Sequence, residues 1–264
     1  MLNPSVVYVS NFLASLFKDG ASYDAVNAAR SALSAFIPSA SHATIGSRPN
    51  GCRLVKGTFE ERPALPKYTD TWYVSQVLDH LCLLPTISEL TLKQLTLRTV
   101  MLLTLLTGQR GHASHLVTVD DLRMSKDKCA IVSSSKHTQT KAGVHTAPAE
   151  ISAFESNLKL SLVSHLREYL RRTASLRKGK KLFVLVVVVP VSRTFSRWVK
   201  ETLADVGINT DRYSYHSTRA ASCSAASRQG MNLSAILQAA GWSSNSTFSC
   251  FYRKVVVDSP ANFG

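Results

Sequence analysis

The sequence predicts a mainly α protein of the α+β class, in which a short helical domain precedes a larger helical domain with a small antiparallel sheet. Apolar residues recur at helical spacing over most of the 264 residues. Short strand-like runs flank a polar connection near the middle of the chain. Glycine and proline interrupt residues 39–66, so two domains are expected rather than one.

Two helices are expected at the amino terminus, over residues 5–18 and 22–37, with Pro38 ending the second. Residues 39–66 are expected to be loop or linker because of their glycines and prolines. The sequence therefore predicts a partial helical domain over 1–58, a linker over 59–67 and the large domain over 68–264.

The large domain is expected to begin with two capped helices. Asp70 is placed to cap the first, which carries Trp72, and Thr91 is placed to cap a stronger one over residues 92–106. Gly108 suits the left-handed residue that ends a helix. Arg110 is therefore expected just beyond a buried helix end, on a rigid support.

Strands and further helices are expected in the rest of the domain. The strands cover residues 117–120, 129–133 and 144–151, and the last two form a hairpin with a basic tip. The apolar run 182–189 is far short of the roughly 20 residues that cross a membrane, so we interpret it as a buried strand or connection. The helices are expected over 155–174, 192–206, 216–229, 231–240 and 246–254, with Gly207, Gly230 and Gly241 as stops.

Composition indicates a polyanionic partner. Lys and Arg number 31 against 17 acidic residues, which gives a formal net charge of +14. Charge alone fits a ribosomal or membrane-surface protein equally well. The five cysteines never form a C-x-x-C pair, so neither a disulfide framework nor a zinc site is expected. No secretory signal is recognised, and a reducing, intracellular compartment is expected.

Basic residues crowd between positions 159 and 200, with Glu168 nearly alone against them. A solvated helix face normally interleaves both signs, so this bias favours a phosphate-facing surface over a merely soluble basic face. The candidate DNA contacts, which include one hairpin lysine, are Lys141, Arg171, Arg172, Lys178, Lys180, Lys181, Arg193 and Arg197.

His216 and Arg219 are three residues apart at the start of a predicted helix, so both side chains leave one face and can meet one phosphate. Each candidate has an ordinary explanation when it is taken alone. An arginine beyond a helix stop usually caps carbonyls, a hairpin lysine is usually solvated, and an H-x-x-R pair often arises by chance. Trp242 and Tyr252 would by themselves be interpreted as packing residues.

The order of these residues resembles the tyrosine recombinase, or phage integrase, superfamily. That family's catalytic domain carries T-G-x-R, a β-hairpin lysine, H-x-x-R on a helix, G-H/W and then a tyrosine. The matching residues are Thr107–Arg110, Lys136, His216–Arg219, Gly241–Trp242 and Tyr252. The resemblance covers roughly residues 68–258, and residues 216–226 and 240–248 are most similar to recombinases of eukaryotic mobile elements of the DIRS and Crypton kinds.

The resemblance implies an integrase-type catalytic domain behind a DNA-clamping domain, and a site-specific recombinase that cuts and rejoins double-stranded DNA to integrate or excise a mobile element. Tyr252 would attack the scissile phosphorus, giving a 3′-phosphotyrosyl link and a free 5′-hydroxyl. Arg110 and Arg219 would hold the non-bridging oxygens with their planar guanidinium groups.

The remaining candidate residues are expected to transfer protons or to pack against the tyrosine segment. His216 is the natural partner for the tyrosine proton. The resemblance assigns protonation of the departing 5′-oxygen to Lys136, with Lys141 and His137 as rival candidates. Trp242 could bond a phosphate oxygen through its one N–H and pack against the tyrosine segment.

The resemblance further implies no metal, no cofactor and a homotetramer assembled on DNA. No membrane association is expected. The expected location is the nucleus if the protein is eukaryotic, and the cytoplasm otherwise. The family's DNA-clamping domain usually has more helices than the two expected over residues 1–58. A catalytically impaired DNA-binding remnant is therefore the alternative, and a type IB topoisomerase is a third. Neither the DNA target sequence nor the direct or inverted arrangement of the ends can be predicted, because groove contacts and DNA deformability decide readout.

Overall fold

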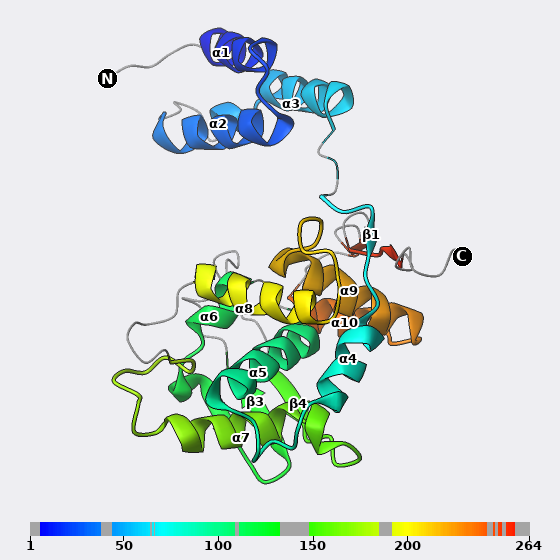
Figure 1. The fold of residues 1–264 in the computed structure, drawn as a ribbon. Coiled ribbons are helices and arrows are strands. Elements are labelled where there is room, and N and C mark those ends of the chain that lie inside the picture. The colour runs from blue at the N-terminus through cyan, green and yellow to red at the C-terminus, as the bar shows by residue number, and fades with distance from the viewer. Residues whose placement is uncertain are drawn as a thin grey trace, which may run out of the picture. The chain divides into compact units, whose positions relative to one another are not determined.

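The computed structural model describes residues 6–37, 44–63, 65, 67–108, 111–132, 148–184, 192–241, 245, 248–249 and 252–256. The chain divides into two compact units, Met1–Lys67 and Tyr68–Gly264, each with its own core. Helices dominate both, and the antiparallel sheet among the described residues is small (Figure 1). The predicted fold class is confirmed.

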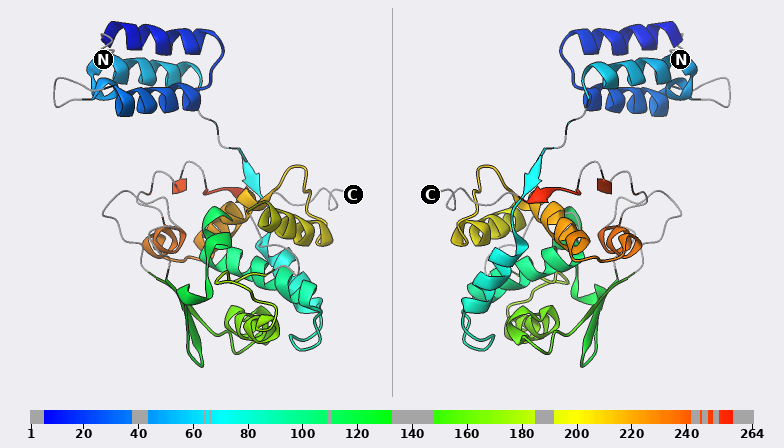
Figure 2. Two further views of the ribbon diagram at one scale, coloured as in Figure 1. Left: turned by 90° about the vertical axis from the view of Figure 1, so that its left-hand side faces the viewer. Right: turned by 90° about the vertical axis from the view of Figure 1, so that its right-hand side faces the viewer.

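The amino-terminal unit consists of α1 (Val6–Lys18), α2 (Tyr23–Phe36) and α3 (Pro49–Glu61), with a 3-10 turn at Ile45–Ser47. The three helices lie side by side in both views of Figure 2. Val9, Leu13, Phe17 and Val26 form a small core between them. The two helices expected here are confirmed.

Helix α3 contradicts the loop expected over residues 39–66. Pro49 occupies the first turn, where a missing N–H costs nothing. The buried Val55 and the partly buried Leu54 face the other helices. Arg62 then donates to the carbonyl oxygens of Phe17 and Ala21, at 2.9 and 3.1 Å. A helical glycine costs only about 1 kcal/mol relative to alanine, so tertiary packing outweighs the two inside α3.

Helix α5 (Leu92–Thr107) is the centre of the second unit and is buried along most of its length. Thr91 and Gln94 form a capping box at its start, and Gly108 ends it with a φ of 54°, as the sequence predicts. Helices α7 (Leu162–Thr173), α8 (Ser192–Asp205) and α9 (Tyr215–Arg228) pack around it (Figure 1). A cluster of aromatic rings fills the space beside α8, formed by Tyr169, Phe183, Phe195 and Trp198.

The small sheet has strand order β2–β3–β4, with β2 at Leu122–Met124, β3 at Lys128–Ile131 and β4 at Ala149–Ser152. The antiparallel pairing of the predicted hairpin is confirmed, with Cys129 opposite Ile151. The strand expected over 117–120 is reduced to an isolated antiparallel bridge between Thr118 and Lys181. Residues Val119–Asp121 form a 3-10 turn, because the Asp121 carboxylate accepts bonds from the amide and hydroxyl of Thr118 at 2.7 Å.

Two further expectations in this unit need correction. Helix α4 begins at Val74 and ends at Leu83, so Asp70 does not cap it. Asp70 lies instead in β1 (Asp70–Thr71), which pairs in parallel with β5 (Val255–Val256). The helix expected over 246–254 is correct at Phe248 and Ser249, which are helical, but Tyr252 lies in a turn and residues 253–254 have no regular structure before β5 begins.

The remaining helices follow the prediction with shifted bounds. Helix α7 starts at Leu162, after a 3-10 turn at Leu158–Leu160, and α10 covers Leu233–Ala240. Short α6 covers Gly111–Leu116. The predicted stops have positive φ angles and are Gly207, Gly230 and Gly241. In the apolar run 182–189, Leu182 and Phe183 are buried and residues 185–189 lie outside the described residues.

Candidate active site

Helix α9 carries two of the predicted catalytic residues. The run from Ser217 to Ser224 is buried because its small side chains allow close packing against α5, α8 and α10. His216, in the first turn, is exposed. Arg219, one turn further, is only 5% exposed. The helix thus presents an imidazole at the surface and a guanidinium from within the fold.

The guanidinium of Arg219 lies beside the ring of Tyr252. Its Cζ atom is 5.3 Å from the centroid of that ring. Nη2 donates to the carbonyl oxygen of Ala240 at 2.7 Å, which ties the side chain to the last turn of α10. A fixed cation beside a phenol stabilises negative charge there, and the same cation can stabilise a phosphate that approaches the phenol oxygen.

The backbone of Tyr252 is held from both sides. Its amide donates to the carbonyl of Phe248 at 2.9 Å, and Phe248 is buried with Cys223 and Ile236. On the other side, Ser224 Oγ donates to the Tyr252 carbonyl at 2.7 Å and accepts from the Lys254 amide at 2.9 Å. Tyr252 itself is half-buried against this cluster. The backbone of Tyr252 is therefore bonded to α9, the helix that carries Arg219.

The end of α5 and the start of α6 also meet α9. A Cβ placed on Gly108 would lie 3.3 Å from Cys223 Sγ and 3.8 Å from Ala240 Cβ, so α5 ends in close contact with α9 and α10. The hydroxyl of Tyr215 donates to Ser114 Oγ of α6 at 3.2 Å, and burial raises the Tyr215 pKa to about 12. The segments on either side of Arg110 thus both contact the helix that carries His216 and Arg219.

Several predicted site residues lie outside the described residues. They are Arg110, Lys136, His137, Lys141 and Trp242. The structure therefore brings together Arg219 and Tyr252, with His216 on the same helix. The catalytic roles of all these residues stay predictions.

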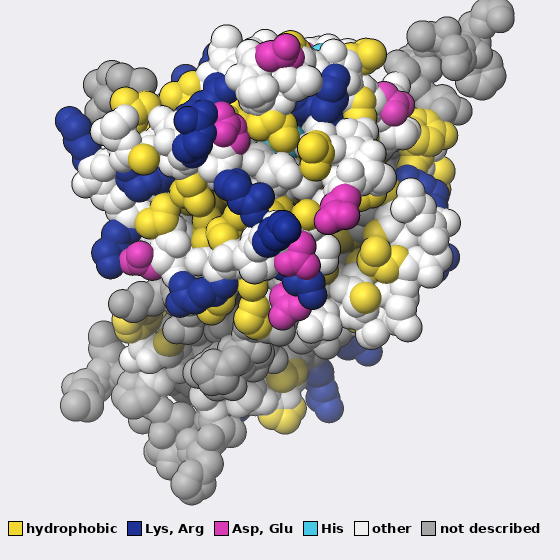
Figure 3. All heavy atoms as spheres, turned by 90° about the horizontal axis from the view of Figure 1, so that it is seen from below, with side chains coloured by type: hydrophobic (Ala, Val, Ile, Leu, Met, Phe, Trp, Pro, Cys, Tyr) yellow, Lys and Arg dark blue, Asp and Glu magenta, His cyan; other side chains and the backbone are white. Residues whose placement is uncertain are grey.

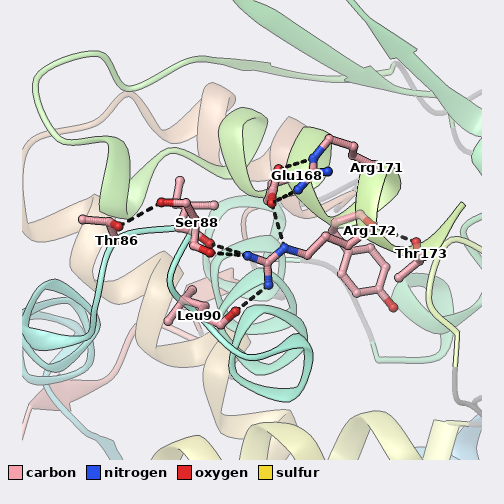
Figure 4. Close-up of polar contacts among 9 residues, drawn as sticks. Thr86, Ser88, Leu90, Glu168, Arg171, Arg172 and Thr173 are labelled. Carbon is pink, nitrogen blue, oxygen red and sulfur yellow. Dashed lines mark hydrogen bonds and ion pairs between the residues drawn. The ribbon is translucent and has the colours of Figure 1, made fainter.

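Arg172, a predicted DNA contact, is held within the fold. Its Nε donates to Glu168 at 2.7 Å, while Nη1 and Nη2 donate to the carbonyls of Leu90 and Ser88, both at 2.5 Å (Figure 4). Hydrogen bonds from Arg171 and then Arg172 lower the Glu168 pKa to about 2. Arg172 thus joins α7 to the segment before α5, and its predicted contact with DNA remains a prediction.

Other basic residues of this stretch are also engaged in contacts. Lys180 donates to Asp120 at 2.7 Å, which raises the Lys180 pKa. Lys181 donates to the Leu116 carbonyl at 3.1 Å. On the face seen in Figure 3, basic side chains are interleaved with acidic and apolar ones. The candidates Lys178, Arg193 and Arg197 are exposed.

The site includes contacts that the sequence patterns do not indicate. Ser224 meets Tyr252 across 28 residues of chain, and Tyr215 meets Ser114 across 101. The run of small residues after Arg219 is a signal for close packing of α9, but it does not identify the partner. Within the described parts of the chain, no three His, Cys, Asp or Glu side chains cluster as a metal site, and no helix is long and apolar enough to cross a membrane.

This arrangement of helices, small sheet and tyrosine segment is the fold of the tyrosine recombinases. The chain is similar to the XerH site-specific recombinase bound to its difH substrate, at 14% identity and a TM-score of 0.58, over 94% of this chain and 67% of that one. It is similar to the integrase of transposon Tn1549 in complex with transposon right end DNA, at 14% identity and a TM-score of 0.59, over 94% and 80%.

The family follows from the sequence itself. The phage integrase family model matches residues 78–256, and the chain belongs to the phage integrase family. No curated protein matches the chain. At 14% identity, the solved structures establish the fold alone.

Proposed function

We propose that this protein is a site-specific DNA recombinase that cuts and rejoins DNA through a 3′-phosphotyrosyl intermediate. The observation that carries the proposal is the guanidinium of Arg219, 5.3 Å from the ring of Tyr252 and fixed by its bond to Ala240. A nucleophile and a positioned cation are two parts that cleavage of a phosphodiester requires.

In the proposed reaction, the phenol oxygen of Tyr252 forms a bond to the scissile phosphorus as the bond to the 5′-oxygen breaks. His216, the exposed residue of the first turn of α9, accepts the phenol proton. Lys136 supplies the proton for the departing 5′-oxygen, with Lys141 and His137 as the rival donors. The aryl phosphodiester that results keeps the energy of the broken bond, so a 5′-hydroxyl can reverse the reaction without ATP.

The transition state places additional negative charge on the non-bridging oxygens. Arg219 and Arg110 would each hold these oxygens through a planar pair of N–H donors, and Trp242 would add one further N–H. Loss of one such donor typically costs about 10²–10³-fold in rate, so either arginine is expected to be indispensable. No step requires a metal ion or a cofactor in this proposal.

The proposal extends to the assembly and its biological context. Strand exchange needs two duplexes to be cut and rejoined, so we infer a homotetramer assembled on DNA. The sequences of residues 216–226 and 240–248 support a recombinase of a eukaryotic mobile element of the DIRS or Crypton kind, active in the nucleus. A tagged protein that stays in the cytoplasm of dividing cells would contradict the proposed location.

A suicide-substrate assay tests the function. Nicked duplexes that tile the DNA flanking the coding sequence are incubated with wild type and with Tyr252→Phe, in buffer containing EDTA. Wild type is expected to form a covalent protein–DNA adduct on the duplexes that contain the site, and Tyr252→Phe to form none. An adduct that persists in Tyr252→Phe, or one that requires Mg²⁺, would contradict the mechanism.

Two further assays, a gel shift and plasmid relaxation, separate the alternatives. A gel shift without any adduct on the flanking DNA would support the DNA-binding remnant. Relaxation of supercoiled plasmid without preference for a sequence would support the topoisomerase. Several basic residues, such as Arg172, form hydrogen bonds within the fold, so the net charge does not by itself establish DNA binding. The gel shift measures that binding directly.

A further inference from the structure

The segment Tyr68–Trp72, which we call the entry segment, is the first stretch of the catalytic unit and touches two parts of the site at once. It contains strand β1, and Thr71 and Trp72 are fully or nearly buried. Asp70 is 9% exposed, an unusual environment for a carboxylate without paired donors. A carboxylate buried to this degree needs hydrogen-bond donors or a cation beside it, and Asp70 has both.

On one side, the entry segment holds the start of α9. The Asp70 carboxylate accepts the hydroxyl of Tyr213 at 2.5 Å and forms an ion pair with Arg212. Two more bonds lie within the next turn of chain, since the hydroxyl of Tyr68 lies 2.8 Å from Ser214 Oγ and Trp72 Nε1 donates to Ser217 Oγ at 2.9 Å.

These contacts hold the start of α9, where a side-chain cap is missing. Ser214 is the N-cap residue of α9, but its side chain makes no capping hydrogen bond. Ser217 Oγ donates to the Ser214 carbonyl at 2.7 Å while it accepts from Trp72. The first turn of α9, which includes His216, is therefore positioned by the entry segment. Burial and the bond to Asp70 raise the Tyr213 pKa to about 12, which keeps this hydroxyl a donor.

On the other side, the entry segment holds the chain that follows Tyr252. Asp70 pairs with Val255 and Thr71 with Val256 in the parallel β1–β5 ladder (Figure 1). Val255 is three residues after Tyr252, and the intervening Lys254 amide is bonded to Ser224 Oγ of α9. A displacement of β1 would thus move both the chain beside Tyr252 and helix α9, which carries His216 and Arg219.

We propose that Asp70 is a positioning residue for DNA cleavage, which fixes α9 and β5 to each other through the entry segment. This inference rests on the proposed function. Asp70 does not touch the phosphate; it sets the separation between Tyr252 and the His216–Arg219 pair. A displacement of about 1 Å in such an arrangement can cost on the order of a hundredfold in rate, so a side chain remote from the chemistry can control it.

The test compares Asp70→Ala and Asp70→Asn with a matched control, Glu201→Gln. Asn keeps an acceptor for Tyr213 but loses the charge that pairs with Arg212. Glu201 is a carboxylate of α8 that pairs with Lys93 of α5, away from the entry segment. Single-turnover cleavage at saturating suicide duplex, DNA affinity by gel shift and backbone hydrogen exchange are measured on the full chain.

Cleavage should slow by about tenfold to a hundredfold in Asp70→Ala, and less in Asp70→Asn, with DNA affinity unchanged. Exchange should accelerate at residues 214–217 and 254–256 together, and in the entry segment that joins them, but nowhere else in the catalytic unit. Glu201→Gln should match wild type in both measurements. Cleavage at the wild-type rate in Asp70→Ala, a parallel loss of DNA affinity, or faster exchange at only one of the two segments would overturn the proposal.

The two proposals fail in different ways. If wild type forms no adduct, the proposed function fails, and the exchange experiment still decides whether Asp70 holds both segments. If wild type forms the Tyr252 adduct and Asp70→Ala forms it equally fast, only the positioning role fails. Should Asp70→Ala not fold, Asp70→Asn gives the same comparison from a folded protein.

Discussion

Replacing Arg219 by lysine should separate its part in catalysis from its part in folding. The guanidinium is 5% exposed, donates to the Ala240 carbonyl at 2.7 Å and lies 5.3 Å from the Tyr252 ring centroid. A lysine keeps the charge but lacks the planar fork that can serve a carbonyl and a phosphate oxygen at once. Loss of one donor to the transition state is worth about 2.7–4 kcal/mol, or ~10²–10³-fold in cleavage rate.

The loss of folding free energy in Arg219→Lys should differ from the loss of transition-state stabilisation. If the ammonium does not reach Ala240, a buried carbonyl loses its partner, which costs about 1–3 kcal/mol. Urea unfolding measures this loss, and single-turnover cleavage of the suicide duplex measures the rate per folded molecule. A cleavage rate close to that of wild type in Arg219→Lys would refute the assignment of this guanidinium to the phosphate.

Arg98 provides the matched control. It is also a buried arginine on a helix, 1% exposed, and donates to the carbonyls of Leu81 and Pro85 at 2.6 and 3.0 Å. Arg98→Lys should therefore lower stability at least as much as Arg219→Lys does. Its cleavage rate per folded molecule should equal that of wild type, and an equal loss in both variants would reduce the Arg219 effect to one of folding.

Three further predictions follow from the described contacts and the proposed roles. Gly108→Ala should lower the free energy of unfolding by about 1–2 kcal/mol, because the backbone at φ 54° disfavours a side chain and the new Cβ would meet Cys223; an unchanged urea midpoint would contradict this packing. Burial lowers the pKa of His165 from 6.5 to about 4, so the fold favours the neutral ring. Stability should fall as pH drops through that window, by roughly 3 kcal/mol in total, and a His165→Gln variant that keeps the full slope would refute the assignment. Lys136→Ala should cleave ordinary DNA slowly but recover on DNA with sulfur in place of the scissile 5′-oxygen, since a thiolate leaves without a proton; equal defects on both substrates would move the proton donor elsewhere.

Local signals account for the parts of the fold that the sequence predicts well. The Thr91 cap, the long apolar helix after it and the stop at Gly108 are all short-range features, and each lies where it is expected. Helix α3 is missed because Pro49 and the glycines resemble breakers, whereas contacts with α1 and α2 stabilise it. Its interior faces a core that no short window of sequence reveals.

Long-range partners explain the remaining differences. Asp70 is of a residue type, and at a position, typical of a helix cap. Its carboxylate instead accepts the hydroxyl of Tyr213, 143 residues away, and its backbone lies in strand β1. Arg172 belongs to a basic run, but its guanidinium bonds the Ser88 and Leu90 carbonyls, more than 80 residues before it. For the site, the motif order assigns Arg219 and Tyr252 to one set, and the two side chains lie side by side. Their bonds to Ala240 and Ser224 depend on the tertiary fold, which no motif reveals.

The identity of the covalent link tests the central claim most directly. The adduct from the suicide duplex is digested with nuclease and trypsin, and the modified peptide is sequenced by mass spectrometry. We expect a nucleotide joined through its 3′-phosphate to Tyr252, in the peptide that ends at Arg253, and a free 5′-hydroxyl on the released strand. A nucleotide on any other residue, or one joined through its 5′-phosphate, would contradict the account.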